Sequence, residues 1–114
     1  MLGIKDWTMA IAGFPDPFIT CCFVGDFTIF VALIDNETCT HYHFLWDIKL
    51  RSIIGDPQKV QFDQNEKKNF PYKSFYDEQA DEIYVFYRQG YSFIIDAKDV
   101  SKFSCERMTD SDLG

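Results

Sequence analysis

An alternation of side-chain character over residues 39–51 constrains the fold of this chain more than any other feature. The even positions carry mostly aromatic and aliphatic side chains: Thr40, Tyr42, Phe44, Trp46, Ile48 and Leu50. The odd positions carry mostly polar ones: Cys39, His41, His43, Leu45, Asp47, Lys49 and Arg51. Because successive side chains of a β-strand point to opposite faces, this period of two predicts a strand. We expect the aromatic set to face the core, the histidine set to face solvent or a neighbouring element, and Asp47 to mark a bend.

The residue composition extends the β prediction to the rest of the chain. Aromatic residues together with Ile, Val and Thr make up 42 of the 114 residues, whereas Ala and Leu make up only 10. β-Branched and aromatic side chains fit a pleated sheet and lose rotamer freedom on a helix. Two continuous apolar runs, residues 18–24 and 27–34, predict central strands buried on both faces and joined in a hairpin by Gly25-Asp26.

The remaining residues divide into short segments separated by turn residues. We expect a polar connection over residues 55–71 with one short strand at 60–62, and further strands at 74–76, 83–87, 91–95 and 102–108. Only residues 5–12 and 109–113 have a helical character. Eight or so strands at this spacing predict one all-β, mainly antiparallel domain over residues 1–114. The architectures that fit are a small β-sandwich, an open barrel or a two-blade β-propeller-like segment.

An internal repeat relates residues 14–54 to residues 72–108. Each unit ends a strand on a hydrophobic residue and an aspartate, Trp46-Asp47 in the first and Ile95-Asp96 in the second. The two aspartates are 49 positions apart, and Ile29 and Ile83 are 54 apart. This plan resembles successive blades of a WD-repeat-like β-propeller, although Ile95 stands where that family commonly has Trp. Because a propeller ring needs about four or more blades, the resemblance implies further blades, from a longer chain or from associated copies.

The charge balance disfavours two classes of partner. The chain has 11 basic and 18 acidic residues, a formal net charge of −7. Nonspecific binding to nucleic acids and to anionic membranes draws its affinity from Lys and Arg, and no basic cluster is present here. No apolar stretch reaches the ~18 residues that a membrane-spanning helix needs. We therefore expect a protein partner or self-association, with no nucleic acid and no membrane.

Cysteine usage indicates the compartment. The four cysteines, Cys21, Cys22, Cys39 and Cys105, form no Cys-x-x-Cys pair, and the N-terminus lacks the apolar run of a secretory signal. We expect a cytoplasmic, intracellular protein with free thiols. A disulfide remains open if a signal peptide precedes this numbering.

One strand has the spacing of a metal site. Cys39, His41 and His43 alternate, so their side chains share one face of a strand, and zinc accepts sulfur and nitrogen ligands. A further ligand has to come from elsewhere, with Asp35, Glu37 or Asp47 as candidates. A polar strand face explains the same three residues without any metal, and we expect no cofactor. Neither a thiol nucleophile nor a calcium loop at residues 77–82 has the required local pattern.

Aromatic residues in the second half suggest an interaction surface. Tyr84, Phe86 and Arg88 lie on one face of their strand, and Tyr87 and Tyr91 flank the turn that follows. Tyr and Arg are common at interface hot spots, although the core of a sandwich uses the same aromatic residues. We therefore expect a non-enzymatic protein-binding or assembly module with an aromatic-rich β surface. The alternatives are a metal-binding protein or metal-dependent enzyme that uses Cys39, His41 and His43, and a small apolar-ligand carrier.

Overall fold

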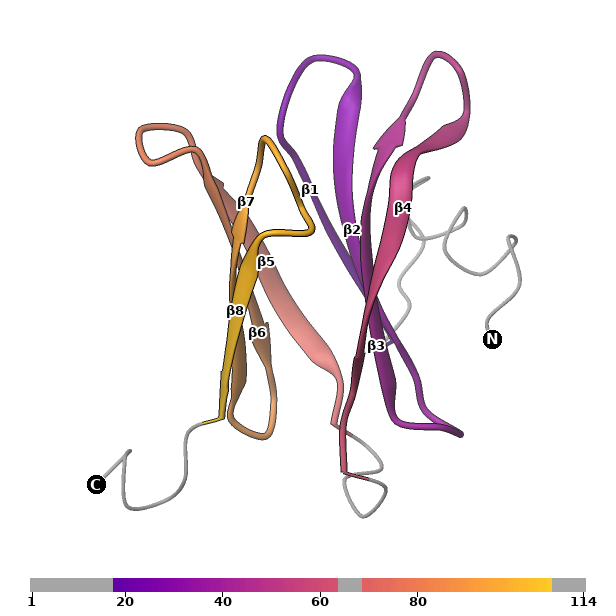
Figure 1. Ribbon diagram of the computed structural model, residues 1–114, viewed down its shortest axis with the longest axis vertical. Coiled ribbons are helices and arrows are strands. Elements are labelled where there is room, and N and C mark those ends of the chain that lie inside the picture. The colour runs from indigo at the N-terminus through magenta and orange to yellow at the C-terminus, as the bar shows by residue number, and fades with distance from the viewer. Residues whose placement is uncertain (1–17, 64–68, 108–114) are drawn as a thin grey trace.

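The chain forms two antiparallel β-sheets of four strands each, as the computed structural model shows for residues 18–63 and 69–107 (Figure 1). The first sheet contains β1 (Ile19–Phe23), β2 (Thr28–Asp35), β3 (Thr40–Asp47) and β4 (Ser52–Gln61). The second contains β5 (Pro71–Asp77), β6 (Glu82–Tyr87), β7 (Tyr91–Asp96) and β8 (Phe103–Arg107). Strands adjacent in sequence are adjacent in each sheet. The described residues contain no helix, so the all-β, mainly antiparallel prediction is confirmed.

Two predicted features concern residues outside this description. The helical character expected at residues 5–12 and 109–113 falls on residues that the structure does not describe. Within the described ranges, no helix of a length and apolarity suited to crossing a membrane is found.

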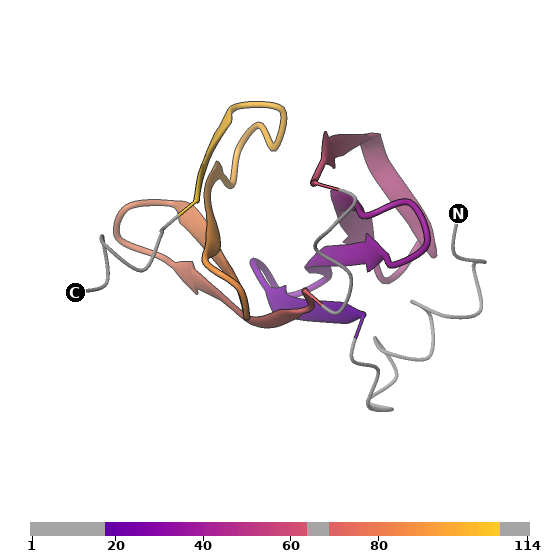
Figure 2. The same cartoon turned by 90° about the horizontal axis from the view of Figure 1, so that it is seen from below.

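The main core lies between the two sheets. β1 and β5 lie side by side, and the sheets fan apart from this junction (Figure 2). Phe30 and Ile34 of β2 belong to the same buried cluster as Ile83 and Val85 of β6 and Phe93 of β7. Since alternate residues of each strand point inward, the inner face of each sheet is covered by the other sheet.

β2 and β1 differ in burial although both were expected to be central strands. β2 is buried on both faces, because Ile29, Val31 and Leu33 belong to a second cluster on the side away from the second sheet. That prediction is confirmed. Among the described strands, β1 is an edge strand that pairs with β2 alone, and its Phe23 is 65% exposed, so the prediction is wrong for this segment.

The alternating segment forms β3, but it is shorter than expected. The strand ends at Asp47, whose Oδ1 accepts a hydrogen bond from the Leu50 amide at 2.9 Å. Residues 48–51 form a turn, and Leu50 is 75% exposed. Asp47 caps the turn and ends the strand at the predicted bend. The alternation over residues 48–51 therefore does not correspond to a strand.

The expected polar connection over residues 55–71 is wrong in its first half. β4 runs from Ser52 to Gln61 and pairs with β3, with a bulge between its Ile54 and Gln58. Gly55 lies in this bulge with φ +74°, and Pro57 follows it. An edge strand tolerates proline and a bulge tolerates glycine, because neither position has to complete a ladder on both sides.

The strand registers reproduce the internal repeat. Ile29 pairs with Trp46 in the first sheet, and Ile83 pairs with Ile95 in the second. These pairs are related by the same steps of 54 and 49 positions that the sequence shows. Asp47 and Asp96 each end the third strand of their sheet and accept a backbone amide in the following turn. The two sheets are therefore consistent with blade-like units.

Candidate functional site

His41 and His43 lie on the face of β3 that packs against the second sheet, and both side chains are fully buried. The His41 ring stacks on Phe93 of β7 with centroids 4.1 Å apart, and His43 packs edge-on against Phe103 of β8. The neighbouring element that the sequence left open is thus the second sheet. Phe44 on the opposite face of β3 is buried too, so the expectation of a single core side is wrong.

A chain of three hydrogen bonds explains why two imidazole rings are stable in this core. The Tyr87 hydroxyl lies 2.6 Å from His41 Nδ1, His41 Nε2 lies 2.8 Å from His43 Nδ1, and His43 Nε2 lies 2.9 Å from the Val100 carbonyl oxygen. The carbonyl only accepts, so His43 Nε2 donates, His41 Nε2 donates to His43 Nδ1, and Tyr87 donates to His41 Nδ1. Both histidines are therefore neutral Nε2–H tautomers, and every ring nitrogen has a partner.

Burial determines the protonation states of the three side chains in this hydrogen-bond chain. Burial, and then the neighbouring His43, hold the pKa of His41 well below its ordinary value. Burial lowers the pKa of His43 to about 4, although its hydrogen bond to the Val100 carbonyl acts in the opposite direction. Burial also raises the pKa of Tyr87 well above its ordinary value. The three side chains are uncharged at neutral pH because the site disfavours any charge.

The structure does not bring the predicted metal ligands together as a site. Cys39 lies in the turn before β3 with φ 56°, so the strand alternation does not extend to it, and its thiol contacts the Asn36 carbonyl. The facing nitrogens of His41 and His43 bond to each other. Among residues 18–63 and 69–107, no group of three or more His, Cys, Asp or Glu side chains is arranged to hold a metal ion.

The cysteines are free thiols with no sign of activation. Burial raises the pKa of Cys21, and it raises the pKa of Cys22 and of Cys105 to about 11. A thiol with a raised pKa stays protonated at neutral pH and is a poor nucleophile. Only Cys39 of the four is fully buried; Cys21 and Cys22 are half-buried and Cys105 is exposed.

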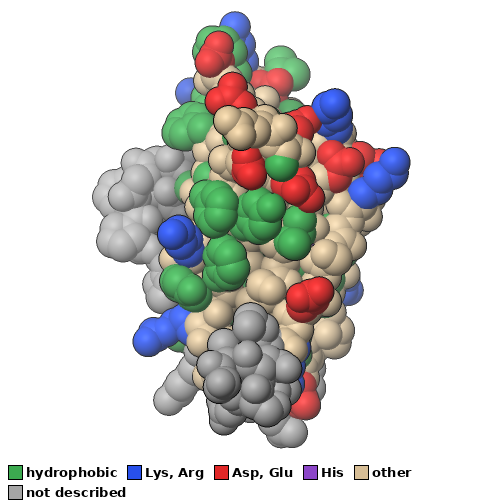
Figure 3. Space-filling view, turned by 90° about the vertical axis from the view of Figure 1, so that its left-hand side faces the viewer, with side chains coloured by type: hydrophobic (Ala, Val, Ile, Leu, Met, Phe, Trp, Pro, Cys, Tyr) green, Lys and Arg blue, Asp and Glu red, His purple; other side chains and the backbone are tan. Residues whose placement is uncertain are grey.

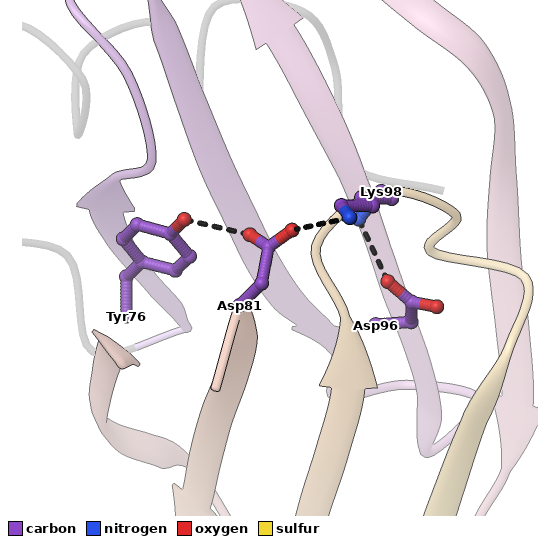
Figure 4. Close-up of polar contacts among 4 residues, drawn as sticks. All are labelled: Tyr76, Asp81, Asp96 and Lys98. Carbon is purple, nitrogen blue, oxygen red and sulfur yellow. Dashed lines mark hydrogen bonds and ion pairs between the residues drawn. The ribbon is translucent and has the colours of Figure 1, made fainter. Parts of the chain in front are cut away.

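The acidic segment at residues 77–82 spans a hairpin turn, and its Asp77 and Asp81 side chains have partners within the protein. The Tyr76 hydroxyl donates to Asp81 Oδ1 at 2.6 Å, and Lys98 Nζ lies 3.8 Å from Asp81 Oδ2 (Figure 4). This bond to Asp81 raises the pKa of Tyr76 to about 12. Asp77 Oδ1 accepts the backbone amides of Gln79 and Ala80. The Lys98 contact connects the β5–β6 turn to the turn after β7.

The five residues predicted as an interaction surface lie on two faces of the second sheet. Tyr87 and Tyr91 point inward, where Tyr87 bonds His41 and the Tyr91 ring stacks on Phe62 at 4.0 Å. Tyr84 and Phe86 lie half-buried on the outer face, and Arg88 is exposed at the β6–β7 turn. The alternation of β6 explains this division, since Ile83, Val85 and Tyr87 share the inner parity.

An aromatic patch occupies the outer face of the second sheet. We define this outer patch by five residues: Tyr72, Phe75, Tyr84, Phe86 and Ile94. Tyr72 is 61% exposed, and Phe75 and Ile94 are each 39% exposed. The rings of Phe75 and Tyr84 stack across β5 and β6 with centroids 4.9 Å apart. Figure 3 shows hydrophobic side chains gathered at the centre of one face, with carboxylates above them and basic groups along the left border.

The sequence analysis missed Tyr72, Phe75 and Ile94. The register explains the omission, because Phe75 pairs with Tyr84 and Ile94 pairs with Tyr84 from the other side. The parity of each strand was visible in the sequence, but only the pairing shows that these parities share one face. A search for the partners of Tyr84 in the two flanking strands would have found Phe75 and Ile94, whereas Tyr72 lies at the irregularity of β5 between Pro71 and Lys73.

A shallow hollow adjoins this patch at the β6–β7 turn. Its volume is about 450 Å³, and its lining consists of Tyr72, Phe86, Tyr87, Arg88, Gly90, Tyr91 and Ser92. Four of the five residues predicted as an interaction surface therefore meet at one end of the sheet. Within the described residues, the Arg88 guanidinium has no ion-pair partner.

The fold defines an all-β protein built from two sheets of sequential antiparallel strands with an exposed aromatic face. No protein-family model matches the chain, and searches of curated proteins and of solved structures found no significant match.

Proposed function

We propose that this chain is a non-enzymatic protein-binding module and that the outer patch of the second sheet is its binding surface. The observation that carries the proposal is the internal repeat. A step of 54 positions relates Phe30 and Ala32 of the first sheet to Tyr84 and Phe86 of the second. A step of 49 positions relates Leu45 to Ile94. The first three face the second sheet, and the last three lie in the outer patch.

This equivalence specifies what kind of surface the outer patch fits. In the first sheet, the positions equivalent to the patch are covered by a four-stranded antiparallel sheet. The same positions in the second sheet are apolar and exposed, as they would be if a further sheet packed there. Exposed apolar patches rimmed by polar residues are typical of protein interaction sites. We therefore assign the outer patch to the apolar face of another β-sheet.

The finer interpretation treats the two sheets as successive blades of a WD-repeat-like propeller. The shared register and the two strand-ending aspartates support it. In that interpretation, the outer patch is the site at which the next blade stacks. The binding proposal does not depend on this relationship, because it rests on exposure and on equivalence within this chain.

The type of partner follows from charge. With a net charge of −7, the chain is poorly suited to nucleic acids or anionic membranes, so the partner is a protein. The four free thiols are compatible with the cytoplasmic location that we propose. A metal-binding function is less well supported, because the nitrogens of His41 and His43 are already bonded. A carrier is less well supported because aromatic rings pack on one another between the sheets, such as Phe62 on Tyr91.

Site-specific photo-crosslinking tests the binding surface in the cell that makes the protein. A photoreactive phenylalanine analogue replaces Phe75 in the patch or, as a matched control, Phe27, which is 49% exposed in the turn after β1. We expect a discrete protein adduct from position 75, lost when Tyr84→Asp is added, and no adduct from position 27. Circular dichroism verifies that the Tyr84→Asp chain is folded. Equal adducts from both positions, or none from position 75, would overturn the proposal.

A further inference from the structure

The charged residues of the outer face are separated along the strands. Asp77, Glu82 and Asp96 form one row across β5, β6 and β7. Phe75 lies in the next row, and Lys73 lies one row further from the acidic row. Arg88 follows β6 at the end of the sheet opposite the acidic row. Two residues are exceptions. Glu106 of β8 pairs with Ser92 near the basic end, and Lys98 lies beside Glu82 and Asp96 at the acidic end, with its ammonium 3.8 Å from Asp81 Oδ2. The face is mainly acidic at one end, aromatic in the middle and mainly basic along the other end.

This separation makes the face complementary to itself. A two-fold axis that lies in the plane of contact and runs across the strands reverses the strand direction in the second copy. The outer residues of β6 and its turn are Glu82, Tyr84, Phe86 and Arg88. They are symmetric about Val85, so the axis places Glu82 of one copy opposite Arg88 of the other. The same operation places Tyr84 opposite Phe86.

The neighbouring strand is consistent with this arrangement. On β5, the axis places Lys73 of one copy opposite Phe75 of the other. Within a single chain, the Lys73 ammonium already lies 5.6 Å from the Phe75 ring, so this lysine is near an aromatic face in either case. A two-fold axis parallel to the strands would instead place the acidic rows against each other, which like-charge repulsion disfavours.

The other large apolar face of the chain is not free to bind. Ile29, Val31 and Leu33 lie on the outer side of the first sheet and are at most 3% exposed. The other exposed large apolar side chains of the described residues lie at turns and edge strands of the first sheet, so we pair the outer patch with the same patch of a second copy, and the contact is symmetric.

We infer that the occupant of the outer patch is a second copy of this chain, packed face to face through β5–β8 with antiparallel strands and reciprocal Glu82–Arg88 pairs. The inference rests on the proposed function, because it names the partner of the same surface. Four strands at about 4.8 Å spacing and three rows of side chains give a footprint of about 400 Å². This is below the ~800 Å² per partner of a standard stable interface, so we expect a weak dimer.

Charge-reversal variants of the full chain test the arrangement by sedimentation velocity. Glu82→Arg places two arginines opposite each other, and Arg88→Glu places two glutamates opposite each other. Each variant alone is expected to dimerise at least about tenfold more weakly than the wild type. An equimolar mixture of the two restores both attractive pairs, and its apparent Kd returns to within about threefold of the wild type. Restoration by mixing is the signature of a reciprocal contact.

Two control variants remove the effect of net charge. Lys59→Glu and Glu37→Arg make the same charge changes at exposed positions of the first sheet, and mixing them is not expected to change dimerisation. A wild type that stays monomeric at 500 μM, or a mixture that associates no better than its components, overturns the inference. The crosslinking experiment separates this failure from failure of the proposed function. An adduct of twice the chain mass supports a second copy, whereas an adduct of another mass supports protein binding and overturns self-association.

Discussion

The buried histidine pair makes the stability of this protein depend on pH in a defined window. His43 has a pKa of about 4 in the folded protein and an ordinary value of 6.5 when unfolded. The unfolded chain therefore binds more protons between these values, and the free energy of unfolding falls as the pH falls below about 6.5. The gap corresponds to a loss of about 3 kcal/mol from His43 by pH 4, of which about 2 kcal/mol is lost by pH 5. The lowered pKa of His41 acts in the same direction.

Urea unfolding at pH 7.5, 6.5, 5.5 and 5.0, followed by circular dichroism, measures this loss. For a domain whose total stability is about 5–15 kcal/mol, a loss of 2 kcal/mol or more is a large shift of the midpoint. Above pH 7 the histidine contribution is fully present and the curve is flat. Asp35 and Asp99 have lowered pKa values, so they destabilise the fold only near and below pH 3.8, outside this window.

A matched control variant replaces all three side chains of the hydrogen-bond chain with apolar ones. In the variant His41→Phe/His43→Leu/Tyr87→Phe no side chain of the set remains to titrate. The two bonds between side chains lose both partners, and the Val100 carbonyl loses its donor, a cost that is the same at every pH of the series. We expect its stability to be nearly independent of pH between 7 and 5. A wild-type curve that changes by less than about 0.5 kcal/mol over that range, or a control with the same slope, would refute the reasoning.

Three further predictions concern the core, the edge strand and the tautomers. Nitrogen NMR of the imidazole rings at pH 7.5 should show both His41 and His43 as Nε2–H tautomers, and an Nδ1–H signal from either ring contradicts the hydrogen-bond chain. Tyr87→Phe should lower the free energy of unfolding by about 1–3 kcal/mol, because His41 Nδ1 loses its donor; an unchanged urea midpoint would show that the bond is unimportant. Gly55→Ala should cost about 1 kcal/mol by thermal unfolding, because φ is +74° there although the surroundings are open; a neutral effect would mean that the bulge relaxes.

Much of the fold was predictable because the strands have their own local patterns. The alternation that predicts β3 holds from Thr40 to Asp47, and the runs at residues 83–87 and 91–95 fall within one residue of β6 and β7. β4 was missed because it is a polar edge strand with Gly55 and Pro57, and such a strand needs neither an apolar period nor an unbroken ladder.

The candidate site was predictable only in part, because its geometry depends on pairing between strands. The shared parity of Tyr84 and Phe86 was visible in the sequence. Their neighbours Phe75 and Ile94 join them through the registers of β5 and β7 with β6. Tyr91 is of a residue type that is common at interfaces, but its ring packs on Phe62, which lies in the other half of the chain.

The sequence by itself determined the β class, the positions of most strands, the strands that end on aspartate and the repeat steps of 49 and 54 positions. These properties follow from local rules, because a period of two and a turn residue act within a few positions. Only the tertiary structure decided which faces are covered. Phe93 covers the ring of His41, burial keeps that ring neutral, and Tyr87, 46 positions away, supplies its hydrogen bond. A strand pattern states which side chains share a face, whereas the packing of sheets decides whether that face is core, solvent or a binding surface.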